Sequence, residues 1–550
     1  MKRHISLLLC AAMLLGFVAL PVSAVTDIEA PTDVPKIIIT TTEEINRDAY
    51  VTSTIKVIDE AGGQYATIED TASSIKIRGN STSSADKKPY NIKFSSKTDV
   101  LGMGKNKKWC LLANCYDKTL LRNISVFDFA RMLGVPYTPD YRVVDVYVNT
   151  TFMGCYLITD AIEVGSTRVD IDTDNNEYLL ELDYNPEDED CQYFYSPTYN
   201  IKFAINEPEK EDLTEEQLAW VTNFMTEAEA ALASGDYNRA SQYFDMESLV
   251  NFYITLEYFK NVDVNTSSTR FHIKDGKIYG GPVWDFDLSS GNCDDSYYGS
   301  YNHYTDNDIS ENTSYEGMWA QNVQWFKRLM RMSDFKNDVY ARYLELQDDI
   351  VNLYADNING QNRIDYYLDT YGASFDRNNE DAGWYVGKVH NPNLQLERDP
   401  DKTYEANVRF YRNWLAKRNE WLLEEWGLDP ELYVYTEEKT VVSEYLSKFG
   451  PTVYFSDGGS ELADNKFVPT GADFVVGDMD YTVIVFGDVY ADGKVDVTDY
   501  IAVKRSCMNT LKLADTAALA ADVNGDDAVD YLDYIMIKRY IMGSYDIYSK

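Results

Sequence analysis

The sequence predicts an α+β protein in which a β-rich part precedes a helix-rich part and a separate all-α module ends the chain. Residues 36–200 contain short runs rich in Val, Ile and Tyr, with one clear helical segment. Residues 209–426 instead carry apolar side chains at helical spacing. Near the C-terminal end, Asp488–Met508 and Asp522–Met542 repeat each other 34 residues apart. A chain of 550 residues is long enough for more than one hydrophobic core.

The composition is strongly acidic, with 90 Asp and Glu against 50 Lys and Arg and a formal net charge of −40. Binding to nucleic acid depends on basic surface that neutralises phosphates. The composition therefore argues against nucleic acid as a partner. The same acidity suits solubility outside the cell and the binding of calcium ions.

The first 24 residues have the pattern of a secretory signal peptide. Met1–Ala24 begins with Lys2 and Arg3, continues through an apolar run and ends in small residues. We expect cleavage after Ala24 and a secreted, extracellular protein. No later apolar run is long enough to predict a transmembrane segment.

Short strands fill the first 200 residues, and their side chains alternate or are β-branched, as in partly buried strands. One helix, capped by Asp117 or Thr119, runs to about Leu133. Lys93 lies on the polar face of a strand, where it can reach a nucleotide phosphate, but spacing alone favours a solvated lysine. The expected strands are Lys36–Thr41, Tyr50–Ile58, Ser74–Asn80, Lys88–Phe94, Trp109–Ala113, Arg142–Val148, Phe152–Thr159 and Tyr178–Asp183.

Amphipathic helices dominate the next part of the chain, which ends at the break Gly427–Pro430. The β-rich and helix-rich parts are expected to form two lobes, and a cleft between lobes is a usual ligand site. Residues 431–486 mix short β-like runs with Gly, Asp and Ser turns and are expected to be a small β segment or an ordered linker. The expected helices are Glu209–Asp236, Met246–Lys260, Met318–Met332, Lys336–Tyr354 and Tyr404–Trp426.

The densest chemistry lies in an acidic hairpin at the junction of the two lobes. Thr269–Lys274 and Lys277–Trp284 are expected strands, joined by Asp275-Gly276 as a type I′ turn. This pairing gathers four oxygen-bearing side chains at the open end of the hairpin, and a hard cation such as Mg²⁺ on a nucleotide phosphate prefers such ligands. The alternative is that the acids cap turns beside core aromatic residues. The four side chains are Asp263, Asn265, Asp285 and Asp287.

Each C-terminal repeat has the spacing of a 12-residue calcium loop followed by a helix. Acids occupy loop positions 1, 5, 9 and 12, and position 7 offers a backbone carbonyl. We therefore expect two Ca²⁺ sites, with calcium binding coupled to folding because the module is small and acidic. The expected ligands are Asp488, Asp492, Lys494, Asp496 and Asp499 in loop one, and Asp522, Asn524, Asp526, Ala528, Asp530 and Asp533 in loop two.

These repeats resemble a type I dockerin over residues 487–546, which implies attachment to a cellulosome through a cohesin of a scaffoldin. Two residues depart from the dockerin pattern. Tyr490 replaces Asn at position 3 of loop one, and Asp527 replaces Gly at position 6 of loop two, where a positive φ is favoured. We expect loop one to bind calcium more weakly. The cohesin contacts that the resemblance implies are Val497, Thr498, Lys504, Arg505, Tyr531, Leu532, Lys538 and Arg539.

An ordered set of segments within residues 36–427 resembles the CotH kinase family of spore-coat protein kinases. The resemblance implies a two-lobed, divergent protein-kinase-like domain that uses ATP and Mg²⁺ to phosphorylate Ser on proteins. A Gly-rich loop of the kind found in ordinary kinases is not evident. The segments are RGNST (78–82), KKPYNIKF (87–94), LGMGKNKKWCLLANCYDKTLLRN (101–123), VYVNTTFMGCYLITDAIE (146–163), YLLELD (178–183), NVDVN (261–265) and GPVWDFD (281–287).

The CotH resemblance also implies roles for individual side chains. Asp263 matches the catalytic aspartate that orients the acceptor hydroxyl, and Asp285 matches the metal-binding aspartate. Asn265 or Asp287 would assist Asp285 in holding Mg²⁺. The resemblance also implies nucleotide contacts by Arg78, Lys93 and Glu163, with Glu163 as the partner of Lys93.

Two functions of different classes are consistent with these features. One is an active kinase attached to a cellulosome. The other is a non-catalytic, pseudokinase-like component that binds protein or polysaccharide while the dockerin attaches it. Exported proteins meet little ATP, which favours the second, whereas the intact acids Asp263 and Asp285 favour the first. A glycoside hydrolase, a common dockerin-bearing enzyme, is a further alternative that needs two carboxylates at a suitable separation.

Overall fold

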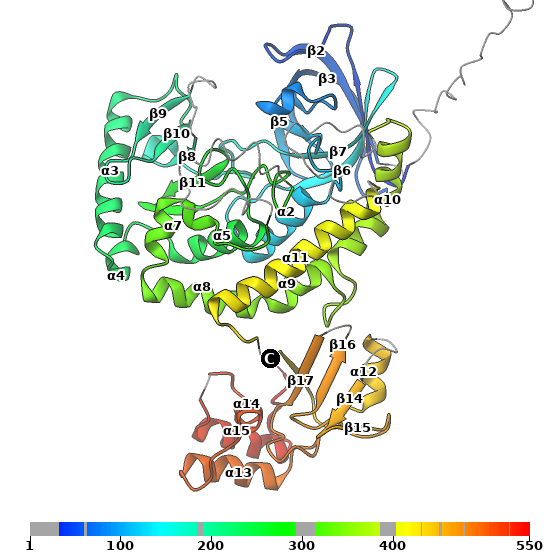
Figure 1. Cartoon of the computed structure of the whole chain (residues 1–550), viewed down its shortest axis with the longest axis vertical. Helices are drawn as coiled ribbons and strands as arrows, with labels where there is room; N and C mark the ends of the chain where they lie inside the picture. Colours follow the sequence, from blue (N-terminus) through cyan, green and yellow to red (C-terminus); the bar gives the residue numbers. More distant parts are fainter. Residues whose placement is uncertain are drawn as a thin grey trace, which may run out of the picture.

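The computed structural model describes residues 32–59, 63–183, 191–292, 314–384, 403–430, 432–449, 454–476, 479–526 and 528–549. The expected signal peptide (residues 1–24) and Asp527 of the second calcium loop lie outside these residues. The described part is a mixed α/β fold (Figure 1). Within these ranges, no helix is both long and apolar enough to cross a membrane.

Seven strands near the N-terminus close into a barrel, in the order β1-β2-β3-β4-β5-β7-β6. The ring closes because β1 pairs in parallel with β6, with Ile37 opposite Val146. Ile75, Ile92 and Trp109 lie opposite one another on neighbouring strands and are fully buried in the core. The strands are β1 (Lys36–Thr40), β2 (Val51–Ile58), β3 (Ile68–Ile77), β4 (Tyr90–Asp99), β5 (Lys105–Leu112), β6 (Tyr141–Val148) and β7 (Thr151–Asp160).

The barrel contains every strand expected between residues 36 and 160, with some ends shifted; β3, for example, begins at Ile68. Closure of the ring was not expected, because periodicity identifies strands but not the pairing of distant ones. The closed barrel does not confirm the two-lobed, kinase-like description. The mixed α/β fold is the part of that expectation that the structure supports.

A second sheet contains the acidic hairpin and has the strand order β12-β11-β8-β10-β9. The predicted hairpin register is confirmed, with Lys274 opposite Lys277. Asp275 and Gly276 have φ of 49° and 72°, as a type I′ turn requires. The strands are β8 (Tyr178–Leu182), β9 (Gln192–Tyr195), β10 (Lys202–Glu207), β11 (Thr269–Lys274) and β12 (Lys277–Gly280), of which β9 and β10 were not predicted.

The second hairpin strand ends at Gly280, so the prediction that it continues to Trp284 is wrong. Gly281 has φ of 98°, which an extended strand does not adopt. Pro282 then lacks the N–H that a ladder needs. Residues 281–292 therefore form an irregular loop. Contacts other than strand pairing position the acidic side chains of this loop.

Helices surround this second sheet and contact the barrel. Nearly every residue of α5 (Met246–Phe259) is buried, and α11 (Tyr404–Trp426) has the predicted bounds. The expected helix Lys336–Tyr354 is divided at Leu346 into two helices, and α10 (Arg363–Glu380) was not expected. The remaining helices before the C-terminal part are α2 (Arg122–Leu133), α3 (Glu215–Ala233), α4 (Tyr237–Ala240), α7 (Gln324–Leu329), α8 (Ser333–Glu345) and α9 (Gln347–Tyr354).

A five-stranded sheet follows α11, and we call residues 432–486 the β module. Its strand order is β13-β17-β16-β14-β15, and α12 (Val442–Phe449) packs against it. A separate hydrophobic cluster runs from Val434 to Val485. Figure 1 shows the module below the larger part of the molecule. The strands are β13 (Tyr433–Thr436), β14 (Tyr454–Asp457), β15 (Ser460–Glu461), β16 (Asp473–Val476) and β17 (Met479–Val485).

The calcium-loop module ends the chain and lies beside the β module (Figure 1). Its helices are α13 (Val497–Cys507), α14 (Asp515–Ala521) and α15 (Tyr531–Ile541). The rings of Tyr500 and Tyr534, which occupy equivalent places in the two repeats, meet edge to face 6.0 Å apart. The expected domain limits, 36–427, 431–486 and 487–546, stay predictions.

Candidate functional site

Two loops bring the acids of the hairpin together, one following α5 and the other following β12. The side chain of Asn261 connects them. Its Nδ2 donates to the carbonyl of Asp285 (3.1 Å), and its Oδ1 accepts the backbone N–H of Asp263 (3.2 Å). Asp285 has φ of 62°, in the left-handed region that non-glycine residues rarely adopt. Backbone strain of this kind often occurs at functional sites.

The carboxylates of Asp263, Asp285 and Asp287 repel one another. Burial and then the charge of Asp285 raise the pKa of Asp263 to about 7. Burial, followed by the charges of Asp285, Asp117 and Asp263, raises the pKa of Asp287 well above its ordinary value. The ion pairs found among the described residues include none of these three carboxylates. A divalent cation would relieve the repulsion.

A buried ion pair lies close to this acidic cluster, since the charge of its Asp117 contributes to the raised pKa of Asp287. Arg122 Nη1 lies 2.6 Å from Asp117 Oδ1, and both side chains are almost fully buried. The Nε of Arg122 donates to the carbonyl of Ser289 (3.0 Å), and Asn123 Oδ1 accepts the N–H of Phe286 (2.9 Å). The first turn of α2 thus holds the loop that carries Asp285 and Asp287. Sequence reasoning missed Arg122 and Asn123, although both belong to a segment of the CotH resemblance.

Two cations adjoin Trp284, the residue before Asp285. The guanidinium of Arg78 lies 5.1 Å from the centre of the Trp284 ring, and that of Arg270 lies 5.9 Å from it. Glu181 Oε2 lies 2.7 Å from Arg270 Nη2, while Nη1 of Arg270 is buried and has no hydrogen-bond partner among the described residues. Arg78 therefore lies beside the residue that precedes Asp285, and its nucleotide contact stays a prediction. Arg270 is an additional cation that was not predicted.

Lys93 and Glu163 do not form the expected pair. Lys93 is exposed on β4, opposite Lys108 of β5. The carboxylate of Glu163 contacts Arg168 and lies 3.3 Å from Lys108 Nζ. The reason is the strand order: β5, not β4, pairs with β7, the strand that leads into Glu163. Lys108 therefore lies between the two predicted partners.

Asn265 lies in the turn that follows Asp263, where the N–H of Thr266 donates to the carbonyl of Asp263 (2.9 Å). Across the part of the chain that the structure describes, no group of three or more His, Cys, Asp or Glu side chains is arranged to hold a metal ion. The donor set nevertheless has the chemistry that Mg²⁺ prefers, because it consists of carboxylates and an amide oxygen.

The aspartate at position 12 closes each calcium loop. Asp499 Oδ1 accepts the N–H groups of Val489 and Tyr490, both at 2.9 Å, and its Oδ2 accepts the N–H of Asp496 at 2.9 Å. Asp533 accepts the corresponding three N–H groups in loop two. Positions 9 and 12 also form a capping box at the start of α13 and of α15. Side-chain oxygens at the expected positions suit Ca²⁺.

A family model described as CotH kinase protein matches residues 75–422, more than half of the 550 residues. The chain belongs to the CotH kinase protein family. A second model, the dockerin type I domain, matches residues 486–542. Both matches confirm resemblances that were recognised in the sequence. A comparison with curated proteins finds none that matches this chain.

Type I dockerins bind calcium and imply a cohesin partner. This CotH protein is therefore a dockerin-bearing component of the cellulosome type. All eight residues that the sequence assigned to cohesin contact are exposed. Val497 and Tyr531, at equivalent places in the two repeats, are 57% and 58% exposed. Ile501 and Ile535 are also exposed on the same helices and were not predicted. Exposed apolar side chains gathered on one small module are typical of a binding surface.

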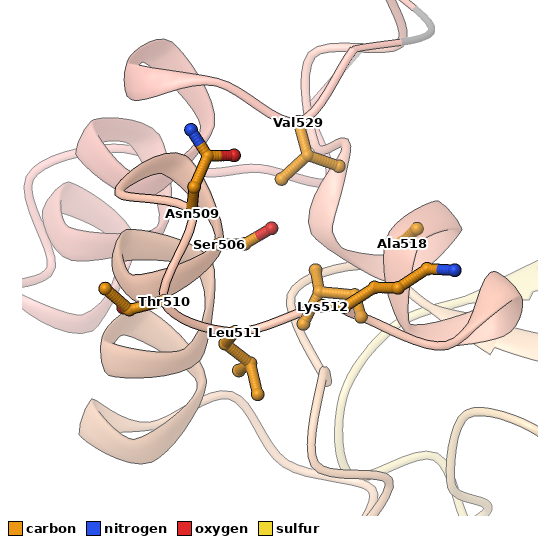
Figure 2. Close-up of a pocket in the computed structure, with 8 residues that line it drawn as sticks. Ser506, Asn509, Thr510, Leu511, Lys512, Ala518 and Val529 are labelled. Atoms are coloured by element: carbon orange, nitrogen blue, oxygen red, sulfur yellow. The ribbon is translucent and has the colours of Figure 1, made fainter.

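A groove of about 530 Å³ lies between the end of α13 and α14 of the dockerin (Figure 2). Lys512 is the only charged residue among those that line it. The lining therefore offers neither a carboxylate pair nor a metal-binding set, and we assign it no catalytic role. Its residues are Ser506, Asn509, Thr510, Leu511, Lys512, Leu513, Ala518 and Val529.

Proposed function

We propose that this CotH protein is a secreted protein kinase that uses ATP and Mg²⁺ to phosphorylate serine on protein substrates, while its dockerin attaches it to a scaffoldin cohesin. The observation that carries the proposal is the group of carboxylates Asp263, Asp285 and Asp287, which no ion pair among the described residues compensates. Under this proposal the barrel forms one lobe of a kinase-like domain and the helix-rich part forms the other.

Phosphoryl transfer requires mainly positioning and charge neutralisation. Asp285, assisted by Asp287 or Asn265, is proposed to hold Mg²⁺. When bound, the cation would neutralise the charge that accumulates on the nucleotide phosphates. Arg78 beside Trp284 is proposed to contact those phosphates directly.

Asp263 is proposed to orient the hydroxyl of the acceptor serine. A pKa of about 7 is suitable for a group that accepts a proton near neutral pH. Lys93 and Glu163 remain proposed nucleotide contacts. Glu163 would act through Lys108 and Arg168, which are its partners in the structure.

Calorimetry of the full chain with ATP and Mg²⁺, followed by label transfer to serine-bearing proteins, tests the proposal. Asp285→Ala should abolish metal-dependent nucleotide binding. Asp263→Ala should leave binding largely intact and stop transfer, because its assigned partner is the acceptor hydroxyl. Asp275→Asn in the turn of the same hairpin is the matched control and should behave like the wild type.

The outcomes separate the alternatives. If the wild type binds no nucleotide, the non-catalytic component that binds protein or polysaccharide is the better description. If it binds ATP but transfers no label, it is a pseudokinase. If both alanine variants match the wild type, the site has been placed wrongly even though the family is established.

A further inference from the structure

The first calcium loop is built against the β module, whereas the hydrogen bonds described for the second loop do not involve that module. Asp488, at position 1 of loop one, is fully buried. Its Oδ2 accepts the N–H of Thr470 in the β module (2.9 Å) in addition to the N–H of Gly493 in its own loop (2.9 Å). The equivalent Asp522 is half-buried, and its Oδ1 accepts N–H groups from Gly525 and Asp526 of its own loop.

The β module also contacts loop one on both sides of position 7, Lys494, whose carbonyl is an expected calcium ligand. The N–H of Lys439 donates to the carbonyl of Gly493 (2.8 Å), and the N–H of Val495 donates to Glu438 Oε2 (2.8 Å). A Cβ added at Gly493 would lie 2.7 Å from the Cβ of Phe467. Loop one therefore packs against the β module without room for a larger residue at position 6.

Glu438, which accepts the N–H of Val495, makes further contacts in this region, and its side chain is only 10% exposed. Its Oε1 accepts the hydroxyl of Tyr540 from α15 (2.8 Å). The backbone N–H of Glu438 donates to the Tyr548 hydroxyl, which in turn donates to the carbonyl of Phe486 (both 2.9 Å). Glu438 thus joins loop one, helix α15 of the dockerin and the end of the β module.

We propose that Glu438 is a positioning residue for the first calcium site. Its carboxylate does not bind the ion; it holds the N–H of Val495 and thereby fixes the neighbouring carbonyl of Lys494. A loop held in its closed shape loses less conformational entropy when the cation binds. This support compensates for Tyr490, which supplies no ligand at position 3 and is 55% exposed.

The packing leaves the predicted cohesin surface free. Val497 and Thr498 begin α13 directly after loop one and are exposed, although the preceding Val495 is buried. The contacts of the β module with loop one therefore leave these two residues exposed. The inference concerns the dockerin alone and does not depend on whether the CotH domain transfers phosphate.

Calcium titration of the full chain in the Asp522→Ala background measures the calcium affinity of loop one. The double variant Asp488→Ala/Asp522→Ala is the blank, which measures calcium binding by the rest of the chain. Glu438→Ala should weaken loop-one affinity by about ten- to hundred-fold, the usual range when a partner of a ligand is removed. Glu438→Gln should recover part of this loss, because the amide oxygen can still accept the N–H of Val495. Glu437→Ala, which removes the same charge from an exposed neighbour, should leave affinity unchanged.

The Asp488→Ala background reports loop two, where Glu438→Ala should leave the affinity unchanged. Equal losses in the two loops would mean general destabilisation of the module and would overturn the proposal. The proposal would also be overturned if Glu438→Ala and Glu437→Ala bound calcium in loop one with the same affinity. Circular dichroism at saturating calcium checks that each variant is folded. If Glu438→Ala is unfolded, Glu438→Gln provides the test. A loop-one affinity of Glu438→Gln equal to that of the Asp522→Ala parent would then reject the proposal.

Discussion

Arg122 and Asp117 form an ion pair in which Nη1 and Oδ1 lie 2.6 Å apart and both side chains are almost completely buried. The guanidinium also lies 4.6 Å from the centre of the Tyr411 ring, and it donates to the carbonyls of Ser289 and Ser290. This pair therefore joins α2 and α11 to the loop that carries Asp285 and Asp287.

Replacing Arg122 by Met should strongly destabilise the CotH domain. The substitution leaves Asp117 buried and uncompensated beside Asp287, and breaking a buried pair in this way costs about 3–5 kcal/mol. Urea denaturation of the full chain measures the loss. Arg131→Met on the same helix, where the ion pairs are more exposed, should cost less than about 1 kcal/mol. Comparable losses from both substitutions would contradict the assigned role of Arg122.

Asp263→Asn should flatten the dependence of stability on pH. The pKa of Asp263 in the folded chain, about 7, lies above its ordinary value of 3.8, so the folded chain binds this proton more tightly than the unfolded chain. The resulting stabilisation is present below about pH 4 and is lost as the pH rises through about 7. The free energy of unfolding of the variant should therefore fall less over this range than that of the wild type.

Urea denaturation across this pH range provides the measurement for Asp263→Asn. Asp275→Asn makes the same chemical change in the turn of the same hairpin and should retain the wild-type slope. If the Asp263→Asn curve runs parallel to that of the wild type, burial and the charge of Asp285 do not raise the pKa of Asp263 in the folded chain.

Tyr490→Asn should strengthen calcium binding by loop one. The asparagine restores a side-chain oxygen at position 3, matching Asn524 in loop two, and ligand number tunes the affinity of such loops. Calorimetry in the Asp522→Ala background should show tighter binding by about tenfold, equivalent to about 1.4 kcal/mol. Tyr531→Asn, a change of the same kind outside the ligand positions, is the control. Unchanged affinity in Tyr490→Asn would exclude position 3 from the coordination sphere.

Glu257→Gln should unfold or severely weaken the helix-rich part. Glu257 on α5 and Arg418 on α11 are both fully buried, with 2.7 Å between Oε1 and Nη2. The glutamate also accepts the N–H groups of Trp319 and Ala320. Removing its charge leaves Arg418 unpaired at a cost of about 3–5 kcal/mol. Thermal unfolding of the full chain measures this, and the exposed Glu247→Gln on the same helix should change little.

Much of the candidate site was predictable because the interactions that create it are local. The Asp275-Gly276 turn fixes the register of β11 and β12, and the predicted pairing of Lys274 with Lys277 is confirmed. The extension of the second strand to Trp284 was wrong, since Gly281 and Pro282 interrupt the ladder. The acids still meet, but through the side chain of Asn261 rather than through strand pairing.

Local sequence by itself determined the hairpin turn, the helix α11 and the two calcium loops, because each depends on hydrogen bonds and periodicity within a few residues. Tertiary structure decided the closure of the barrel, the choice of Lys108 rather than Lys93 as the partner of Glu163, and the contact of Glu438 with loop one. These relationships join segments that are far apart in the chain. Which distant segments meet is set by packing of the whole core and by strand order, and neither leaves a periodic signal in the sequence.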